Sequence, residues 1–243
     1  MKPVLIFLII IALSLTTIFV LRNLNKSTNV IEDVNLTSTT NKALGAEISY
    51  GNTAKKQVIF TFDGGSSIQS GQSILNILKK HNVKGTFFLT GKTVTNYPDF
   101  VKQIAVQGSE IFNHTYDHKD LTKLSDVEIA AELNGMEKVL QNTVSVSSKP
   151  YFRAPYGSRD ARVLAAAQNA GYRSVFWTVD AMDWKESRGE TTDQVKNIIL
   201  SNLKPGTIYL MHVGDNITGQ ILDDVFTQIE SKGYKIVSLT QGL

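Results

Sequence analysis

The sequence from Lys56 to the C-terminus predicts an α/β fold, a closed or nearly closed parallel barrel. Two observations carry this prediction. Short apolar runs alternate with longer segments whose apolar residues fall on one helical face. Several of the apolar runs also end in a charged or polar residue. In parallel α/β folds that is the end of the strand where active sites assemble.

Seven strands are expected, because each run is short, apolar and bounded by polar or glycine-containing segments. The first, Val58–Phe62, is the most continuously apolar and suits a buried strand. The expected strands cover residues 58–62, 85–89, 110–113, 151–153, 173–179, 207–211 and 235–239.

Six helices are expected between these strands. In the first, Ile74, Leu75, Ile77 and Leu78 share one face. Other helices carry end signals: an early proline in the second, a capping box over residues 125–128 in the third, and a stop at Gly171 after the fourth. The expected helices cover residues 69–81, 96–107, 125–140, 162–170, 193–203 and 221–232.

The polar residues at the strand ends are the candidate site residues. His114 and His118 are two of only four histidines in the chain. Imidazoles four residues apart reach one metal ion from a single turn or loop. Asp63 follows the first strand and precedes two glycines, which hold a carboxylate on a tight turn with open backbone. The remaining strand-end candidates are Arg153, Asp180, Asp183 and His212.

Composition narrows the class of protein. The chain of 243 residues has no cysteine, which excludes disulfides, a thiol nucleophile and a thiolate metal site. Its formal net charge is only +3, and no run of lysine and arginine with interleaved aromatics is present. Nucleic acid is therefore not expected as a partner.

The N-terminus predicts a membrane segment. Residues 1–21 contain an uncharged, mostly apolar stretch from Pro3 to Leu21, close to the ~20 residues needed to cross a bilayer. No small-x-small cleavage site follows it directly. We expect an uncleaved single-pass anchor with the domain outside the cell membrane, or alternatively a signal peptide of a secreted protein. Residues 22–55, rich in Asn, Thr and Ser, are expected to form a flexible linker to a domain at 56–243.

Five segments, in this order, resemble the motifs of the polysaccharide deacetylases, carbohydrate esterase family 4. The family reads T-F-D-D-G, H-[ST]-x-x-H, R-x-P-x-G, D-x-x-D-W and L-x-H. The matching segments here are Thr61–Gly65, His114–His118, Arg153–Gly157, Asp180–Trp184 and Leu210–His212. Four match in full, and the resemblance extends from about Lys56 to the C-terminus.

The resemblance implies a distorted (β/α)7 barrel that removes N-acetyl groups from an N-acetylated glycan with the help of a divalent metal. His114 and His118 would bind the metal; zinc is favoured, and cobalt and nickel also suit two histidines. Asp63 would be the general base and His212 the acid for the leaving amine. Arg153 would hold Asp63 ionised and oriented.

Further roles follow from the same resemblance. Asp180 or Asp183 would hydrogen-bond His212, and the family pattern favours Asp183. The backbone N–H of Tyr156 would complete an oxyanion hole. Trp184 and Leu210 would form the wall of the acetyl pocket, although ordinary core packing explains them about as well.

The first motif departs from the family at one position. Gly64 stands where the family has a second aspartate, a metal ligand. Three interpretations stay open: water fills the vacant ligand position, Asp63 moves onto the metal, or the domain is catalytically impaired and only binds sugar on a membrane tether. A hydrolase for a different small acyl or amide bond is a further alternative.

Overall fold

Eight strands form one sheet in residues 46–65 and 67–243, the part of the chain that the computed structural model describes. The strand order is β5-β4-β3-β2-β1-β7-β6, with β8 paired to β1. Every pairing between these strands is parallel. The strands are β1 Gln57–Gly64, β2 Thr86–Leu89, β3 Glu110–Asn113, β4 Tyr151–Phe152, β5 Arg173–Ser174, β6 Val179–Asp180, β7 Ile208–His212 and β8 Lys235–Val237.

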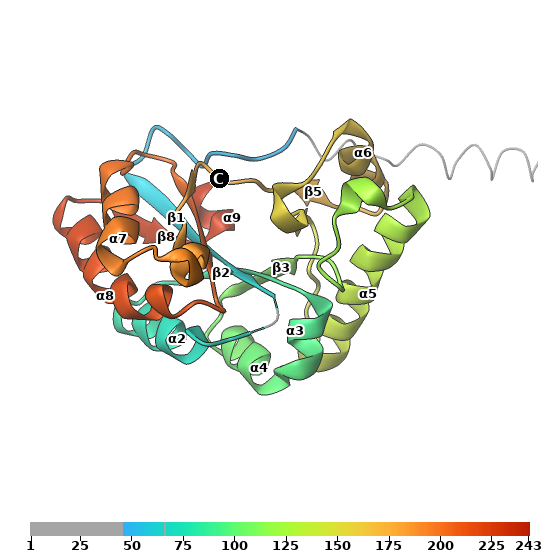
Figure 1. Ribbon diagram of the computed structural model, residues 1–243, viewed down its shortest axis with the longest axis horizontal. Helices are drawn as coiled ribbons and strands as arrows, with labels where there is room; N and C mark the ends of the chain where they lie inside the picture. The colour runs from blue at the N-terminus through green and yellow to red at the C-terminus, as the bar shows by residue number, and fades with distance from the viewer. Residues whose placement is uncertain (1–45, 66) are drawn as a thin grey trace, which may run out of the picture. The chain divides into compact units, whose positions relative to one another are not determined.

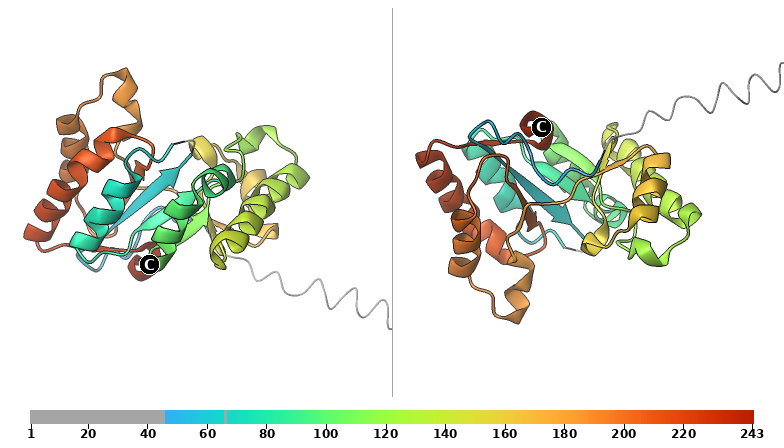
Figure 2. Two further views of the ribbon diagram at one scale, coloured as in Figure 1. Left: turned by 90° about the horizontal axis from the view of Figure 1, so that it is seen from below. Right: turned by 90° about the horizontal axis from the view of Figure 1, so that it is seen from above.

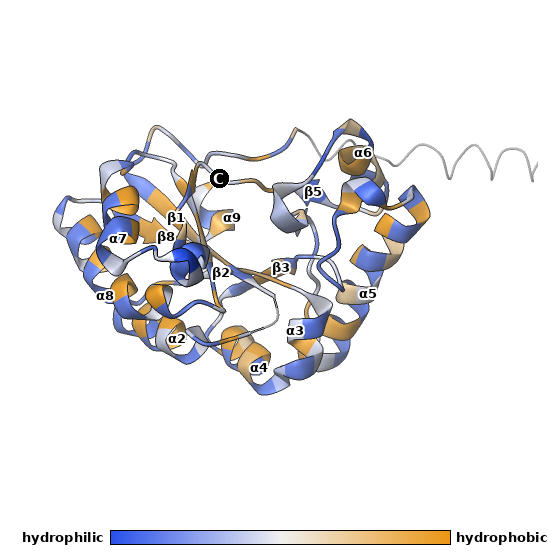
Figure 3. Cartoon of the chain, in the orientation of Figure 1, coloured by the Kyte–Doolittle hydropathy of each residue, from blue (hydrophilic) through white to orange (hydrophobic). Residues whose placement is uncertain are grey.

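Helices lie around the outside of the curled sheet (Figures 1 and 2). They are amphipathic and carry apolar and polar residues on different faces, as Figure 3 shows. Their apolar residues pack against the outward side chains of the strands in the main core. The helices are α2 Gly71–Lys80, α3 Gly91–Asn96, α4 Pro98–Val106, α5 Asp126–Val144, α6 Ala161–Asn169, α7 Thr192–Ser201, α8 Asn216–Ser231 and α9 Leu239–Gly242, with short 3₁₀ turns at Leu121–Lys123, Pro155–Gly157 and Asp183–Arg188.

The prediction of a parallel α/β sheet is confirmed; of the two predicted forms, a closed or a nearly closed barrel, the closed one is wrong. The two end strands, β5 and β6, do not pair with each other within the described residues, so the sheet is an open half-barrel. The predicted single strand 173–179 is instead β5, an irregular stretch over residues 175–178, and β6. Across this stretch the backbone changes its hydrogen-bond partner. Val175 N–H donates to the carbonyl oxygen of Phe152 in β4, whereas Thr178 N–H donates to the carbonyl oxygen of Ile208 in β7.

The alternation of side chains along the strands decides which residues face the inside of the curl. Along β1, Phe60 and Phe62 belong to the outer core beneath the helices, whereas Ile59 belongs to a separate inner core. The period of two puts Asp63 on the inner face with Ile59. The same argument places Leu210 and His212 of β7 on the inner face, because they alternate with Tyr209 and Met211 of the outer core. Gly64, next along β1, falls on the outer side.

The predicted boundary of the domain at Lys56 is too late. Ile48 is buried in the inner core and forms a parallel bridge with Val175. Glu47 makes an ion pair with Arg159 at 2.7 Å. Residues 46–55, which the sequence assigns to the linker, therefore begin the folded domain.

The predicted membrane anchor at residues 1–21 and the linker residues 22–45 lie outside the described residues. Among the helices of residues 46–65 and 67–243, none combines the length and apolarity that crossing a membrane requires.

Candidate active site

Asp63 at the end of β1 is held by a fully buried arginine. Arg153 follows β4 and donates from its Nη1 to Asp63 Oδ1 at 2.6 Å and to Thr61 Oγ1 at 2.9 Å. Its Nε and Nη2 donate to the carbonyl oxygens of Val175 and Phe176. Burial alone would raise the pKa of Asp63, but the charge and hydrogen bond of Arg153 hold it below its ordinary value. Asp63 is therefore ionised at neutral pH.

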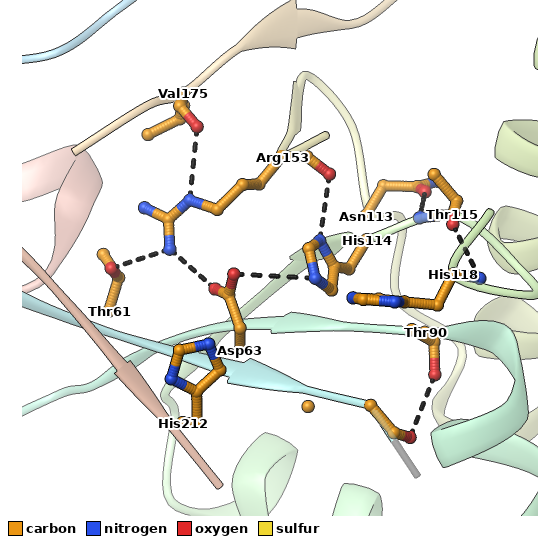
Figure 4. A network of polar contacts seen from close by, with 12 residues as sticks. Thr61, Asp63, Thr90, Asn113, His114, Thr115, His118, Arg153, Val175 and His212 are labelled. Atoms are coloured by element: carbon orange, nitrogen blue, oxygen red, sulfur yellow. Dashed lines mark hydrogen bonds and ion pairs between the residues drawn. The ribbon is translucent and has the colours of Figure 1, made fainter. Parts of the chain in front are cut away.

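The two histidines of the second motif lie on the other side of Asp63 (Figure 4). His114 Nδ1 hydrogen-bonds the Arg153 carbonyl oxygen at 2.9 Å, so this nitrogen carries the proton. Its Nε2 lies 3.5 Å from Asp63 Oδ2. The ring centroids of His114 and His118 are 4.9 Å apart. The loop between them turns through positive φ angles at Thr115 and His118.

His212 at the end of β7 is paired with Asp183. His212 Nδ1 lies 2.9 Å from Asp183 Oδ1, and its backbone N–H donates to Asp183 Oδ2 at 2.7 Å. Asp183 is fully buried and also accepts from Thr218. Burial would lower the pKa of His212, but Asp183 overcomes this and raises it to about 9. His212 is therefore a cation at neutral pH.

Asp63, the two histidines of the second motif and His212 line one cavity of about 670 Å³, whereas Arg153 and Asp183 lie behind Asp63 and His212 and are not part of its lining. Asp180 does not bond His212; its carboxylate accepts from Met182 N–H and from the indole N–H of Trp184. The Tyr156 ring packs against the His118 ring at 4.6 Å and is 72% exposed at the mouth. The cavity lining includes Asp63, His114, His118, Tyr156, Asp180, Trp184, Leu210 and His212.

The two imidazoles suit a divalent metal by their chemistry. Burial lowers the pKa of His114 and brings that of His118 to about 4, so both rings are neutral at neutral pH and keep a lone pair for a cation. The hydrogen bond on His114 Nδ1 leaves Nε2 as the free donor atom, as in many histidine–metal sites. Asp63 is not positioned as a third ligand beside the two histidines. Asp63, His114 and His118 do not have one ligand atom each within 4.8 Å of the other two.

A different group does meet that distance within the described residues. Asp183, His212 and Asp215 have ligand atoms that all lie within 4.8 Å of one another. His212 Nδ1 is already bonded to Asp183, and the pKa of about 9 keeps the ring protonated. A protonated imidazole has no lone pair for a metal, so this group is suited to proton donation instead.

Two residues that the sequence did not single out shape the histidine loop. Glu132 of α5 is 6% exposed, and its Oε2 accepts the backbone N–H groups of Tyr116 and Asp117. Asn113 accepts from Thr115 N–H and donates to the Leu133 carbonyl oxygen. The place of Asn113 directly before His114 is a signal in the sequence that could have identified it. Glu132 has no such signal, because in the sequence it is an ordinary polar position of a helix.

A comparison of the sequence with known families decides the classification. The profile of the polysaccharide deacetylase family matches residues 50–175, a little over half of the chain. The chain belongs to this family. Peptidoglycan-N-acetylmuramic acid deacetylase PdaA of Bacillus subtilis is 33% identical over 189 residues, which cover 78% of this chain and 72% of the relative. Peptidoglycan-N-acetylglucosamine deacetylase of Bacillus cereus is 36% identical over 189 residues, with 76% and 67% covered.

Solved structures of family members share the fold. The structure of B. subtilis PdaA, a family 4 carbohydrate esterase, superposes with a TM-score of 0.77 at 32% identity, over 81% of this chain and 84% of PdaA. A wild-type family 4 pseudoenzyme from Bacillus anthracis superposes with a TM-score of 0.76 at 32% identity, over 81% and 68%. This polysaccharide deacetylase family chain is thus similar both to enzymes and to a pseudoenzyme, so its own site must be argued from its residues.

Proposed function

We propose that this protein is a metal-dependent hydrolase that removes N-acetyl groups from peptidoglycan or a related N-acetylated polysaccharide. The observation that carries the proposal is the pairing of opposite charge states across one cavity. Asp63 is kept ionised by Arg153, and His212 is kept protonated by Asp183. Two titratable groups driven apart in this way suit a base and an acid at the same pH.

The reaction is the hydrolysis of an amide. Asp63 accepts a proton from the attacking water, whose oxygen bonds to the acetyl carbon. The C–N bond then breaks, and His212 gives its proton to the departing amine, so the products are acetate and a free amino sugar. The Tyr156 backbone N–H is suited to stabilise the oxyanion, and Trp184 and Leu210 enclose the acetyl methyl group.

His114 and His118 would hold the divalent cation. When bound, the cation would polarise the acetyl carbonyl and lower the pKa of a water molecule. Zinc is the metal that this proposal favours, and cobalt and nickel are the alternatives. Gly64 provides no third ligand, so the proposal includes a water molecule in that position.

The test is acetate release by the full-length protein from acetylated chito-oligomers and from peptidoglycan glycan strands, with metal content measured in the same samples. We expect activity that chelation removes and zinc restores. His114→Ala should lose both bound metal and turnover. Unchanged activity after chelation would overturn the metal-dependent mechanism.

A catalytically impaired, sugar-binding domain is the second candidate, and Gly64 is the observation that favours it. The similarity to a family pseudoenzyme gives it weight. Zinc-loaded protein that binds these glycans but releases no acetate from any of them would support this candidate over hydrolysis.

For residues 1–21 we propose an uncleaved anchor in the cell membrane, with the domain on the extracytoplasmic side. The apolar run Pro3–Leu21 supports it. The full-length protein should stay with membranes after a high-salt wash. A soluble mature form that begins near Glu47 would show cleavage and secretion instead.

A further inference from the structure

The turn at Pro155–Gly157 has an unfavourable backbone conformation at the edge of the catalytic cavity. Tyr156 has a φ of 60° and Gly157 a φ of 65°, so two successive residues lie in the left-handed region. For Tyr156 this is costly, because its Cβ comes close to the following carbonyl oxygen. A residue in such a conformation persists only where the surrounding structure fixes it. Both residues line the cavity, so whatever fixes this turn also shapes the site.

The hydrogen bonds of the turn set the direction of the Tyr156 N–H. Ser158 N–H donates to the Pro155 carbonyl oxygen at 2.9 Å, and Gly157 N–H donates to the Ala154 carbonyl oxygen at 3.0 Å. The N–H and C=O of a trans peptide point in opposite directions. The Pro155 carbonyl oxygen points to Ser158, which is not part of the cavity lining, so the Tyr156 N–H points away from Ser158. A change in this turn would therefore misdirect the donor that is suited to the oxyanion.

Arg159 fixes the turn from outside the cavity lining. Its Nη1 donates to the Gly157 carbonyl oxygen at 3.0 Å, which restrains the peptide that ends the turn. Its guanidinium carbon lies 3.5 Å from the centroid of the Phe176 ring. Phe176 stacks on Trp177 with ring centroids 3.7 Å apart, and a Cβ at Gly157 would lie only 2.6 Å from Trp177 Cη2. The backbone of Gly157 is therefore bonded by Arg159 and packs directly on the Trp177 ring.

Glu47 holds the Arg159 guanidinium in place. Arg159 Nε donates to Glu47 Oε2 at 2.8 Å, and its Nη2 donates to Oε1 at 2.7 Å, which makes the pair bidentate. Ser174 Oγ donates to the same Oε2 at 2.6 Å. The two charged side chains are only 24% and 20% exposed, so this pair is better shielded and better oriented than an ordinary surface pair. The segment before β1 thus acts on the turn through Arg159.

We propose that Arg159 is a positioning residue for the reaction, which keeps the Tyr156 N–H directed at the oxyanion and is itself fixed by Glu47. This inference rests on the proposed deacetylase function. Arg159 is not part of the cavity lining, so it acts through the Gly157 carbonyl and not on the substrate. An oxyanion donor binds charge that develops only in the transition state. Its displacement therefore lowers kcat and leaves KM nearly unchanged.

The test measures kcat and KM for acetate release from acetylated chito-oligomers by full-length proteins. The variants are Arg159→Met, Glu47→Gln, the double variant of both, and Arg162→Met. Arg162 is the matched control, because it pairs with Asp126 at 2.8 Å, is 41% exposed and lies outside the cavity lining. Urea denaturation of each protein gives the folded fraction to which kcat is normalised, so a loss of stability alone does not count as a loss of kcat.

We expect kcat of Arg159→Met to fall by about tenfold or more, with KM within about twofold of wild type. Glu47→Gln keeps an oxygen that accepts one of the two bonds, so its kcat should fall less. The double variant should be no slower than Arg159→Met, because Glu47 acts through Arg159. Arg162→Met should match wild type.

Two results would overturn the inference: an unchanged kcat in folded Arg159→Met, or a loss confined to KM. Additive losses in the double variant would overturn the part assigned to Glu47. If Arg159→Met does not fold, Glu47→Gln carries the test, and an unchanged kcat in this variant would then contradict the inference.

Hydrogen–deuterium exchange keeps the inference testable if no glycan is deacetylated. The amides of Gly157 and Ser158 are bonded within the turn, so their exchange reports its opening. A peptide fragment that contains residues 154–158 should exchange about tenfold faster in Arg159→Met than in wild type or Arg162→Met, because a hydrogen bond from a charged group is lost. Absence of acetate release alongside this difference would contradict only the proposed function. Equal exchange in Arg159→Met and wild type would contradict the inference.

Discussion

Asp63 and His212 owe their opposite charge states to one partner each. Asp63 is buried, which alone would favour the neutral acid, yet Arg153 keeps its pKa low. His212 is also largely shielded, which alone would favour the neutral ring, yet Asp183 raises its pKa to about 9. Figure 4 shows Asp63 between Arg153 and the histidines. A base and an acid that coexist at neutral pH follow directly from these two contacts.

The alkaline limb of activity is expected to report His212. Because the leaving amine needs a proton from His212, kcat/KM should fall as pH rises through about 9. Asp183→Asn removes the carboxylate that raises the pKa of His212, while the ring stays buried. The alkaline fall in kcat/KM should therefore move to lower pH. A pH profile of kcat/KM measures this. Asp223→Asn, which alters the remote partner of His81, is the control and should leave the limb in place.

An aspartate at position 64 tests the incomplete metal site. A Cβ there would lie 2.6 Å from Leu89 Cδ2, on the outer side of β1, so Leu89 must move in Gly64→Asp and equally in Gly64→Ala. Both variants should lose about 1–3 kcal/mol of stability from overpacking. Gly64 is the last residue of β1, so the carboxylate of Gly64→Asp must turn over the end of the strand to reach the two imidazoles on the inner side. Gly64→Ala has no such group, so only Gly64→Asp should bind zinc more tightly in a calorimetric titration. Equal affinities in the two folded variants would mean that the carboxylate stays on the outer side or that another group already fills the position.

At the residue scale, the structure brings together residues that the sequence singled out where a motif coincides with a strand end. Asp63, Arg153 and His212 were identified and do line or border one cavity. Glu132 could not be predicted, because its role depends on a carboxylate of α5 reaching the backbone of residues 116 and 117. Periodicity along a helix carries no information about such a partner.

At the scale of elements, the long periodic helices and apolar strands were predictable, and two short elements were not. Helix α3 was missed because Thr, Val, Gly and Asn in its sequence are poor helix formers; the side chain of Thr90 caps its start instead. The strand predicted at 173–179 is interrupted after Ser174. There the Arg153 side chain donates hydrogen bonds to the carbonyl oxygens of Val175 and Phe176. An apolar run cannot reveal that its carbonyl groups bond a side chain from elsewhere.

Arg153 thus links β4, the irregular stretch 175–178 and Asp63, and its loss should destabilise the fold. Arg153→Met should lower the free energy of unfolding by about 3–5 kcal/mol, because Asp63 is left as an unpaired buried charge. Urea denaturation measures this. Adding Asp63→Asn should recover part of the loss. Arg162→Met, which breaks a pair whose side chains are 41% and 64% exposed, should change stability by no more than about 1 kcal/mol.

At the scale of the whole domain, the open half-barrel is completed by the segment before β1. The backbone of Ile48 bonds Ser174 and Phe176 beside β5, and that of Gly51 bonds Gly206 before β7. This segment therefore bonds β5, at one end of the sheet, and Gly206, shortly before β7, the strand next to the other end. This role could not be predicted, because residues 46–55 contain few large apolar residues and no periodicity.

A truncation tests this role of the segment. A protein that begins at Lys56 should be less stable than one that begins at Ala46, because it loses the burial of Ile48 and the hydrogen bonds of residues 48–52. Burial of one isoleucine is worth about 1.5–3 kcal/mol, and Ile48→Ala in the longer protein should show a loss of similar size. Tyr50→Ala is the matched control, because the Tyr50 side chain is exposed. Equal urea midpoints for the two lengths would mean that the strands and helices from β1 onward hold the half-barrel by themselves.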